Sequence, residues 1–327
     1  MTDAMTMTAT SLPLPVRPAG IMFHHFHGQG YRVSQGSISA DDLRHMLEAV
    51  DTSRILPARV WVERAVDGRL RDGDLCLTFD DNLRCQFEIA VPVLREFGLS
   101  AFFFVYTSVN EGALERLEIY RYFRHEYFES MDEFYASFFA AVRRTPDATD
   151  VRDALSMFQP REYLPGYTYL SDNDKRFRFV RDRVLGRDGY ARLMDEMLET
   201  HGCVPAQAAR NLWMSNAELV QLRSEGHVIG LHSHTHPTLL EALSSEDQTW
   251  EYTTNKAYLT RLLREAPVAV SHPNNSYSSA TLELLADLGI AVGFRANMAL
   301  SPSSALELPR HNHTIIQRQL MGVPSCG

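Results

Sequence analysis

The sequence predicts an α/β protein in which a parallel sheet is covered by helices. Short apolar runs recur along the chain, and the segments between them mostly carry apolar residues at helical spacing. Because neighbouring parallel strands need a long crossover, this alternation of strand and helix favours parallel pairing. The chain has 327 residues, of which 45% are hydrophobic, and this is enough for a substantial core.

The expected elements follow one another in a regular order. Strands are predicted at residues 20–23, 74–79, 101–105, 226–231, 266–271 and 290–294, with a last one near 306–308. A helix begins after Ser39, where two acidic residues fall in the first turn and apolar residues then repeat at helical spacing. Further helices are predicted after Asp81, from Ser215 and from Ser279.

The alternation is interrupted between about residues 112 and 210. This stretch is rich in aromatic and charged residues, has few strand-like runs and fits several amphipathic helices. We therefore predict a single catalytic domain over residues 20–327, interrupted by this helical insertion. Residues 1–19 are small, polar and proline-bearing, which is typical of a flexible leader.

Composition excludes several classes of protein. With 32 Lys and Arg against 41 Asp and Glu, the formal net charge of −9 argues against a nucleic-acid partner. No apolar run approaches the roughly 20 residues that cross a bilayer, so no membrane contact is expected. No secretory signal and no C-x-x-C spacing are present, which predicts a cytoplasmic protein with reduced thiols. The cysteines are Cys76, Cys85, Cys203 and Cys326.

Two adjacent carboxylates, Asp80 and Asp81, follow the predicted strand 74–79. Like charges side by side at the end of an apolar strand repel each other, and a bound cation is the simplest compensation. The alternative is that the two residues cap the following helix near its positive end.

Three alternating histidines, His232, His234 and His236, follow the predicted strand 226–231. In a turn the outer two can converge, and imidazoles together with one carboxylate suit Zn²⁺ or a similar divalent ion. Such a loop can also be ordinary surface. The carboxylates at the end of another strand favour the metal site, because parallel α/β sheets place their sites at the C-terminal ends of strands.

These two motifs resemble a known family. Thr-Phe-Asp-Asp at 78–81, followed by His-Ser-x-x-His-Pro at 232–237, is similar to the first two motifs of the polysaccharide deacetylases, which include the NodB-like chitooligosaccharide deacetylases. The resemblance covers roughly residues 20–111 and 211–315 and not the insertion. It implies a distorted parallel (β/α) barrel of about seven strands.

The resemblance also assigns roles to residues. It implies that Asp80 is the general base and that Asp81, His232 and His236 bind the metal. His234 occupies a variable position of the motif and is not expected to be a ligand.

The match is weaker at the family's third motif, which resembles Arg-x-Pro-Tyr or a Tyr-Pro variant. Ser271 and Asn274 stand here in place of the family's Arg and Tyr, and either Arg295 or Arg310 is a candidate to replace the Arg. The backbone N–H of Asn274 is expected to serve the oxyanion, and Tyr277 to lie at the substrate. The local sequence is also an ordinary Pro-Asn turn.

The family's last motif supplies a histidine that acts as general acid. His311 and His313 stand at that place, and His313 is slightly favoured. His24, at the end of the first strand, matches a recurring aromatic-His pair and is expected to line the site. His25 and His27 are expected to be loop residues.

The sequence thus predicts a metal-dependent hydrolase, most simply a zinc enzyme, that removes an N-acetyl or similar N-acyl group from a sugar. An insertion after a strand end would cover the site or form a homo-oligomer interface, and a covered site favours a small-molecule N-acylated sugar over a polymer. Two alternatives stay open: hydrolysis of another C–N bond, in a cyclic imide or ureide, and non-catalytic carbohydrate binding with a structural metal.

Overall fold

The computed structural model describes residues 17–164, 170–299 and 304–321. Most of the predicted leader, and Cys326, lie outside these residues. Seven strands form one sheet, in the order β6-β5-β4-β3-β2-β1-β7, and every pair of neighbours is parallel. The strands are β1 (Ala19–Phe23), β2 (Leu75–Phe79), β3 (Phe102–Val105), β4 (Val228–Leu231), β5 (Ala269–Ser271), β6 (Val292–Phe294) and β7 (Arg310–Asn312).

The two outer strands of this sheet are linked through the segment that leads into β7. The Leu308 N–H donates to Gly293 O at 2.8 Å, and the Arg295 N–H donates to Leu308 O at 2.9 Å. This segment therefore lies along β6 and then continues into β7, which pairs with β1. The sheet is a nearly closed barrel, which confirms the predicted fold class.

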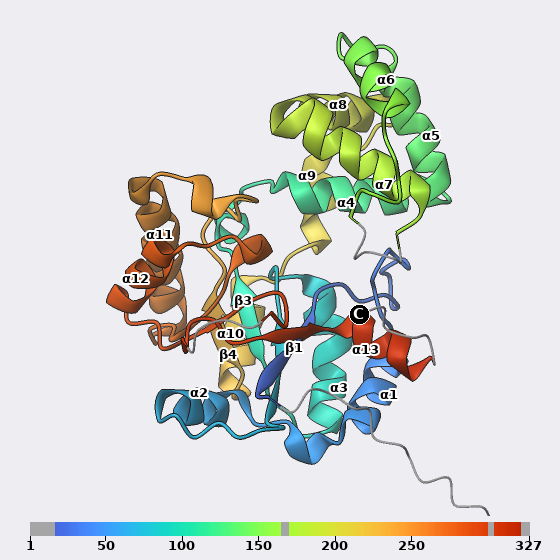
Figure 1. The fold of residues 1–327 in the computed structure, drawn as a ribbon. Helices are drawn as coiled ribbons and strands as arrows, with labels where there is room; N and C mark the ends of the chain where they lie inside the picture. The colour runs from blue at the N-terminus through green and yellow to red at the C-terminus, as the bar shows by residue number, and fades with distance from the viewer. Residues whose placement is uncertain (1–16, 165–169, 300–303, 322–327) are drawn as a thin grey trace, which may run out of the picture. The chain divides into compact units, whose positions relative to one another are not determined.

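Helices cover the outside of the barrel (Figure 1). They are α1 (Ala40–Val50), α3 (Val91–Glu96), α10 (Asn216–Ser224), α11 (Ser245–Leu263), α12 (Ser279–Asp287) and α13 (His313–Leu320). Another helix, α2 (Ala58–Val66), closes the N-terminal end, because its buried Trp61 packs on Phe294 among the inward-facing aromatic residues. The C-terminal ends of the strands are left for polar residues.

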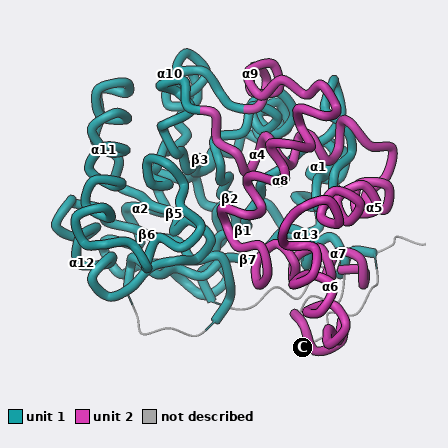
Figure 2. Tube along the Cα trace, turned by 90° about the horizontal axis from the view of Figure 1, so that it is seen from above, with its two compact units in different colours: residues 1–113, 213–325 teal, residues 114–212, 326–327 magenta. Residues whose placement is uncertain are grey.

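Residues 114–212 form a second compact unit, drawn in magenta in Figure 2. Its elements are α4 (Arg116–Glu126), α5 (Met131–Val142), α6 (Ala148–Ser156), α7 (Asp172–Phe179), the π-helix η4 (Val180–Leu185), α8 (Gly186–Thr200), α9 (Pro205–Ala208) and the 3₁₀ turn η5 (Ala209–Asn211). The aromatic side chains of Phe123, Phe134, Phe138 and Phe177 form much of its own core. That both units belong to one catalytic domain stays a prediction.

The sequence prediction was wrong about the last strand. Residues 306–308 were expected to form it, but β7 begins at Arg310, and Leu308 makes only an isolated bridge to Phe294. Pro309 separates the two pairings, and a proline has no N–H to donate to a neighbouring strand. Helices α2 and α11 were also missed. None of the helices in the described part of the chain has both the length and the apolar character that crossing a membrane requires.

Candidate active site

Polar side chains from four strands meet near the C-terminal ends of β2, β4 and β5. Successive residues of a strand point to opposite faces, so Asp80 continues the inward face of β2 and His232 that of β4. Ser271 on β5 and Arg310 on β7 point inward as well, since both contact Asp80. The top of the barrel interior is therefore polar, whereas its lower part is filled with aromatic rings.

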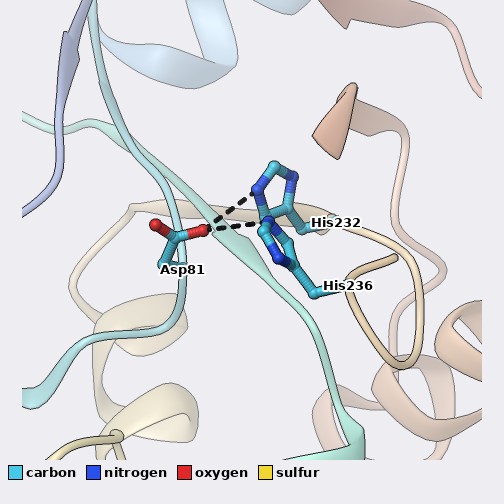
Figure 3. Close-up of side chains that lie close together, drawn as sticks. All are labelled: Asp81, His232 and His236. Atoms are coloured by element: carbon cyan, nitrogen blue, oxygen red, sulfur yellow. Dashed lines mark ion pairs between the residues drawn. The ribbon is translucent and has the colours of Figure 1, made fainter. Parts of the chain in front are cut away.

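Asp81, His232 and His236 form a compact group of possible metal ligands (Figure 3). Asp81 Oδ1 lies 3.2 Å from Nε2 of His232 and 3.3 Å from Nε2 of His236. One ligand atom from each residue falls within 4.8 Å of the others, and all three residues are buried. The structure thus brings together the three residues predicted to bind the metal.

Unusual backbone conformations aim these side chains. Asp81 has a φ of 76°, and Ser233 and His236 have φ values of 59° and 55°. Residues other than glycine seldom adopt this left-handed region, and such strain is concentrated at functional sites. The two turns direct three side chains from different strand ends to one point.

Hydrogen bonds prepare the group for a cation. His232 donates from Nδ1 to the carbonyl oxygen of Ser271 at 2.8 Å, so Nε2, which faces Asp81, is the nitrogen that a cation would bind in place of a proton. Burial by itself raises the pKa of Asp81, but the hydrogen bond from His232 and the neighbouring His236 outweigh it and lower that pKa. An ionised carboxylate and two imidazole nitrogens, whose protons a bound metal would displace, are a donor set that fits a divalent transition metal such as Zn²⁺.

Asp80 lies beside this group and is held by a buried arginine. Nη1 of Arg310 donates to Oδ1 of Asp80 at 2.7 Å, and Nη2 donates to Oδ2 at 2.8 Å. The hydroxyl of Ser271 donates to Oδ2 at 3.0 Å. Burial raises the pKa of Asp80, but the guanidinium of Arg310, with His232, brings it below its usual range. Asp80 is thus kept ionised and fixed in orientation.

Of the two candidates to replace the arginine that the third motif lacks, Arg310 is the one that contacts Asp80. The other candidate, Arg295, instead donates to the carbonyl oxygen of Ala299. The approach of Arg310 requires a glycine on β1: a Cβ on Gly20 would lie 2.9 Å from Cγ of Arg310 and 3.2 Å from Cγ2 of Thr78.

His24 is the partly exposed histidine at this site. Its Nε2 lies 3.9 Å from Oδ2 of Asp80 and 3.9 Å from Oδ2 of Asp81, and 29% of its side chain is exposed. Gln86 is fully buried and donates to the carbonyl oxygens of both His24 and Asp80, at 2.9 and 2.6 Å. Its position at the start of the π-helix η2 (Gln86–Ala90) ties the ends of β1 and β2 together.

The two histidines expected to supply the acid are not brought to Asp80 and Asp81. In His313, Nδ1 contacts Met22 O and Nε2 contacts Gly36 O, each at 3.0 Å, and the ring stacks on Phe23. His311 follows the inward-facing Arg310 on β7, so its side chain points to the opposite face of the sheet. Which histidine acts as the general acid stays a prediction, and the contacts of these two rings give it no support.

Asn274 and Tyr277 lie on the loop after β5. Asn274 is exposed, with a φ of 51°, and its backbone N–H makes no hydrogen bond to any described residue. The hydroxyl of Tyr277 donates to Glu307 at 2.9 Å, and its ring stacks on His272. Among the described residues, the Asn274 N–H therefore has no acceptor, while the Tyr277 hydroxyl is already engaged.

His234 does not join the metal group. Its Nδ1 lies 2.9 Å from Oγ1 of Thr107, and its ring packs against the edge of Trp250. Alternation within the motif places it on the other side of the turn from His232 and His236. This position is consistent with the expectation that it is no ligand.

A comparison with known families matches the part of the chain that carries the histidine motif. Residues 194–293 match the family model described as polysaccharide deacetylase, and this region contains His232, His236 and Ser271. Over this region the chain is similar to the polysaccharide deacetylases. The similarity indicates a hydrolase, because that family acts on N-acetyl groups of carbohydrates.

Solved structures of deacetylases share the fold. The deacetylase PplD from Streptococcus pyogenes, in complex with acetate, has a TM-score of 0.54 at 15% identity, over 95% of this chain and 99% of that one. IcaB from Ammonifex degensii has a TM-score of 0.51 at 13% identity, over 95% and 97%. A de-N-acetylase from Aggregatibacter actinomycetemcomitans has a TM-score of 0.51 at 10% identity, over 90% and 94%.

The extent of these matches adds one point about the fold. Since 95% of the chain is covered, the similarity reaches most of the helical unit, where the sequence motifs give no resemblance. No curated protein matches the chain.

Proposed function

We propose that this deacetylase is metal-dependent and that it removes an N-acetyl or similar N-acyl group from a small sugar or sugar-containing intermediate. The observation that carries the proposal is the group formed by Asp81, His232 and His236 beside an ionised, arginine-held Asp80. Zn²⁺ is the ion we expect, because a site with two histidines and one carboxylate leaves a coordination position open.

A divalent cation held by these three residues would polarise the amide carbonyl and lower the pKa of a water molecule. Asp80 accepts the proton of the attacking water, because its carboxylate is ionised and fixed by Arg310. The free backbone N–H of Asn274 donates to the tetrahedral oxyanion. His24 protonates the leaving nitrogen, since it is the described histidine that lies near both carboxylates and is partly open to solvent.

The position of the helical unit in the chain supports a small substrate. The helical unit is inserted between β3 and β4, and β3 ends at the same edge of the barrel as the site. An insertion at this place favours a compact N-acylated sugar over a long polymer.

A substrate panel and metal analysis test the proposal. We expect the purified protein to contain one divalent ion per chain and to release acetate faster from monomeric N-acetylated sugars than from long chitin or peptidoglycan strands. Faster release from the polymers contradicts the size preference. Turnover of cyclic imides or ureides without turnover of N-acetyl sugars favours the alternative C–N hydrolase. Carbohydrate binding without any turnover favours the non-catalytic alternative.

A further inference from the structure

Helix α11 presents polar side chains to the histidine loop, which comprises residues 232–236. Glu251 and Asn255 are four residues apart and therefore share one face of the helix. They are only 4% and 0% exposed. A buried polar group without a partner costs free energy, so the hydrogen-bond partners of these two side chains indicate the role of this face of α11.

Glu251 holds the middle of the histidine loop. Its Oε2 accepts from the backbone N–H of His234 at 2.7 Å and from that of Thr235 at 2.8 Å. The hydroxyl of Thr235 donates to Oε1. Hydrogen bonds to an ionised group are stronger than neutral ones. One carboxylate thus fixes two consecutive peptide groups between His232 and His236.

Asn255 holds the start of the loop. Its Oδ1 accepts from the backbone N–H of His232 at 3.1 Å, and its Nδ2 donates to Val105 O at 2.9 Å and to Thr107 Oγ1 at 3.1 Å. Thr107 in turn contacts Nδ1 of His234. The histidine loop is therefore tied both to α11 and to the end of β3.

The backbone of the histidine loop needs such support. Ser233 and His236 have left-handed φ values, and each such residue costs roughly 1–3 kcal/mol and persists only where its surroundings fix it. A relaxed loop would change the distance between the Nε2 atoms of His232 and His236. The bonds from α11 stabilise the strained form.

We infer that Glu251 and Asn255 are positioning residues that set the spacing of the two histidine ligands and hence the affinity of the site for a divalent cation. The inference rests on the metal site of the proposed function. Outer hydrogen-bond partners of metal ligands typically change metal affinity about 10- to 100-fold.

The test measures metal affinity directly. The full-length protein is stripped with a chelator, titrated with Zn²⁺ against a chromophoric chelator, and loaded with Co²⁺ for visible absorption. We expect Glu251→Ala and Asn255→Ala each to weaken Zn²⁺ binding about 10- to 100-fold and to alter the Co²⁺ spectrum. Glu251→Gln keeps one oxygen for the loop N–H groups, so it should restore part of the affinity.

Gln248→Ala is the matched control. Gln248 is buried on the same helix but bonds Leu243 O and Thr281, not the histidine loop. We expect this variant to lower the Tm of the metal-free protein and to leave Zn²⁺ affinity within about two-fold of wild type, because it removes a buried hydrogen bond elsewhere.

Two results would overturn the inference while the metal site stands: wild-type Zn²⁺ affinity in both alanine variants, or an equal loss of affinity in Gln248→Ala. If Glu251→Ala does not fold, Glu251→Gln decides, and full affinity with an unchanged Co²⁺ spectrum contradicts the inference. A wild-type chain that binds neither ion would overturn the metal site itself.

Discussion

Arg310 and Asp80 form a buried, two-point ion pair at the centre of the barrel, with donor–acceptor distances of 2.7 and 2.8 Å, although 230 residues separate them in the chain. The pair joins the second strand to the last one. It gives Asp80, the base in the proposed function, a fixed orientation and a low pKa. Five predictions follow from this pair and its surroundings.

Replacing Arg310 should affect both turnover and stability. In Arg310→Gln the carboxylate of Asp80 is left buried without its cation, which costs about 3–5 kcal/mol in the free energy of unfolding. Loss of orientation should lower kcat about 10²-fold. The pKa of Asp80 should rise, so the acidic limb of the kcat/KM profile moves to higher pH. Urea unfolding and a pH–rate profile measure these effects.

The matched control for Arg310→Gln is Arg44→Gln. Arg44 also makes a two-point contact with a carboxylate, from Nε and Nη2 to Glu96, but on the surface. An exposed ion pair is screened by solvent and contributes little to stability, so the control should be nearly neutral. Equal effects of the two variants would contradict the special position of Arg310.

Replacing Asp80 should separate catalysis from metal binding. Asp80→Asn removes the proton acceptor but leaves Asp81, His232 and His236 in place. We expect kcat to fall about 10²- to 10⁴-fold while the metal content stays at the wild-type level. Full activity of Asp80→Asn on the preferred substrate would show that another group is the base.

Replacing His236 should remove the metal, whereas replacing His234 should not. His236→Ala deletes one of three ligands, so we expect loss of the stoichiometric ion in elemental analysis and a fall in activity of about 10²-fold or more. His234→Ala removes a side chain bound to Thr107 and should keep the ion. A stoichiometric ion in both variants would refute the ligand assignment.

The leaving group should decide how much His24 matters. A general acid is needed for an amine leaving group and hardly at all for a good one. We expect His24→Gln to lower kcat about 10²- to 10⁴-fold on N-acetyl sugars, with a much smaller effect on an activated acetate ester. His313→Asn should lower the Tm without this substrate dependence. The reverse pattern would restore His313 as the acid.

Three buried histidines should make the fold sensitive to acid. Burial lowers the pKa of His227, His272 and His313 to about 4. The unfolded chain takes up these protons near pH 6.5, so between pH 6.5 and 4 it binds more protons than the folded chain. The free energy of unfolding therefore falls on acidification, by up to about 1.4 kcal/mol per pH unit for each histidine.

Urea unfolding of the metal-free protein across this pH range measures the slope. His227→Asn keeps an acceptor for the Ala101 N–H, which now donates to Nδ1 of His227 at 3.0 Å. In this variant, the dependence of the unfolding free energy on pH should be smaller by the contribution of one histidine. Replacement of the exposed His45 by Gln should leave that dependence unchanged. A wild-type slope in His227→Asn would contradict the assignment of that proton.

Residues next to strand ends were the easiest part of the site to predict. Asp80, Asp81, His232 and His236 directly follow strands whose apolar runs are plain in the sequence, so the position of each strand also placed its polar residues. Arg310 could be named only as one of two candidates. Because Leu306 and Leu308 are apolar, the last strand was predicted to begin too early in the chain. Whether residue 310 points inward depends on where that strand begins.

Helix α11 was missed for a different physical reason. Its buried positions include Gln248, Glu251 and Asn255, so its core-facing stripe lacks the apolar periodicity by which helices are recognised. The same polarity is what ties it to the histidine loop. The general acid could not be assigned because its choice depends on which histidine faces the carboxylates, and spacing along the chain does not contain that information.

The contact between Gly20 and Arg310 should restrict how the sequences of related chains diverge. The side chain of Arg310 passes through the space that any larger residue at position 20 would fill. An arginine on the last strand and a glycine at its paired position on the first strand should therefore be exchanged together as sequences diverge. In homologues that lack the arginine at the end of the fifth strand, this linked pair would mark chains in which the arginine that holds Asp80 stands on the last strand instead.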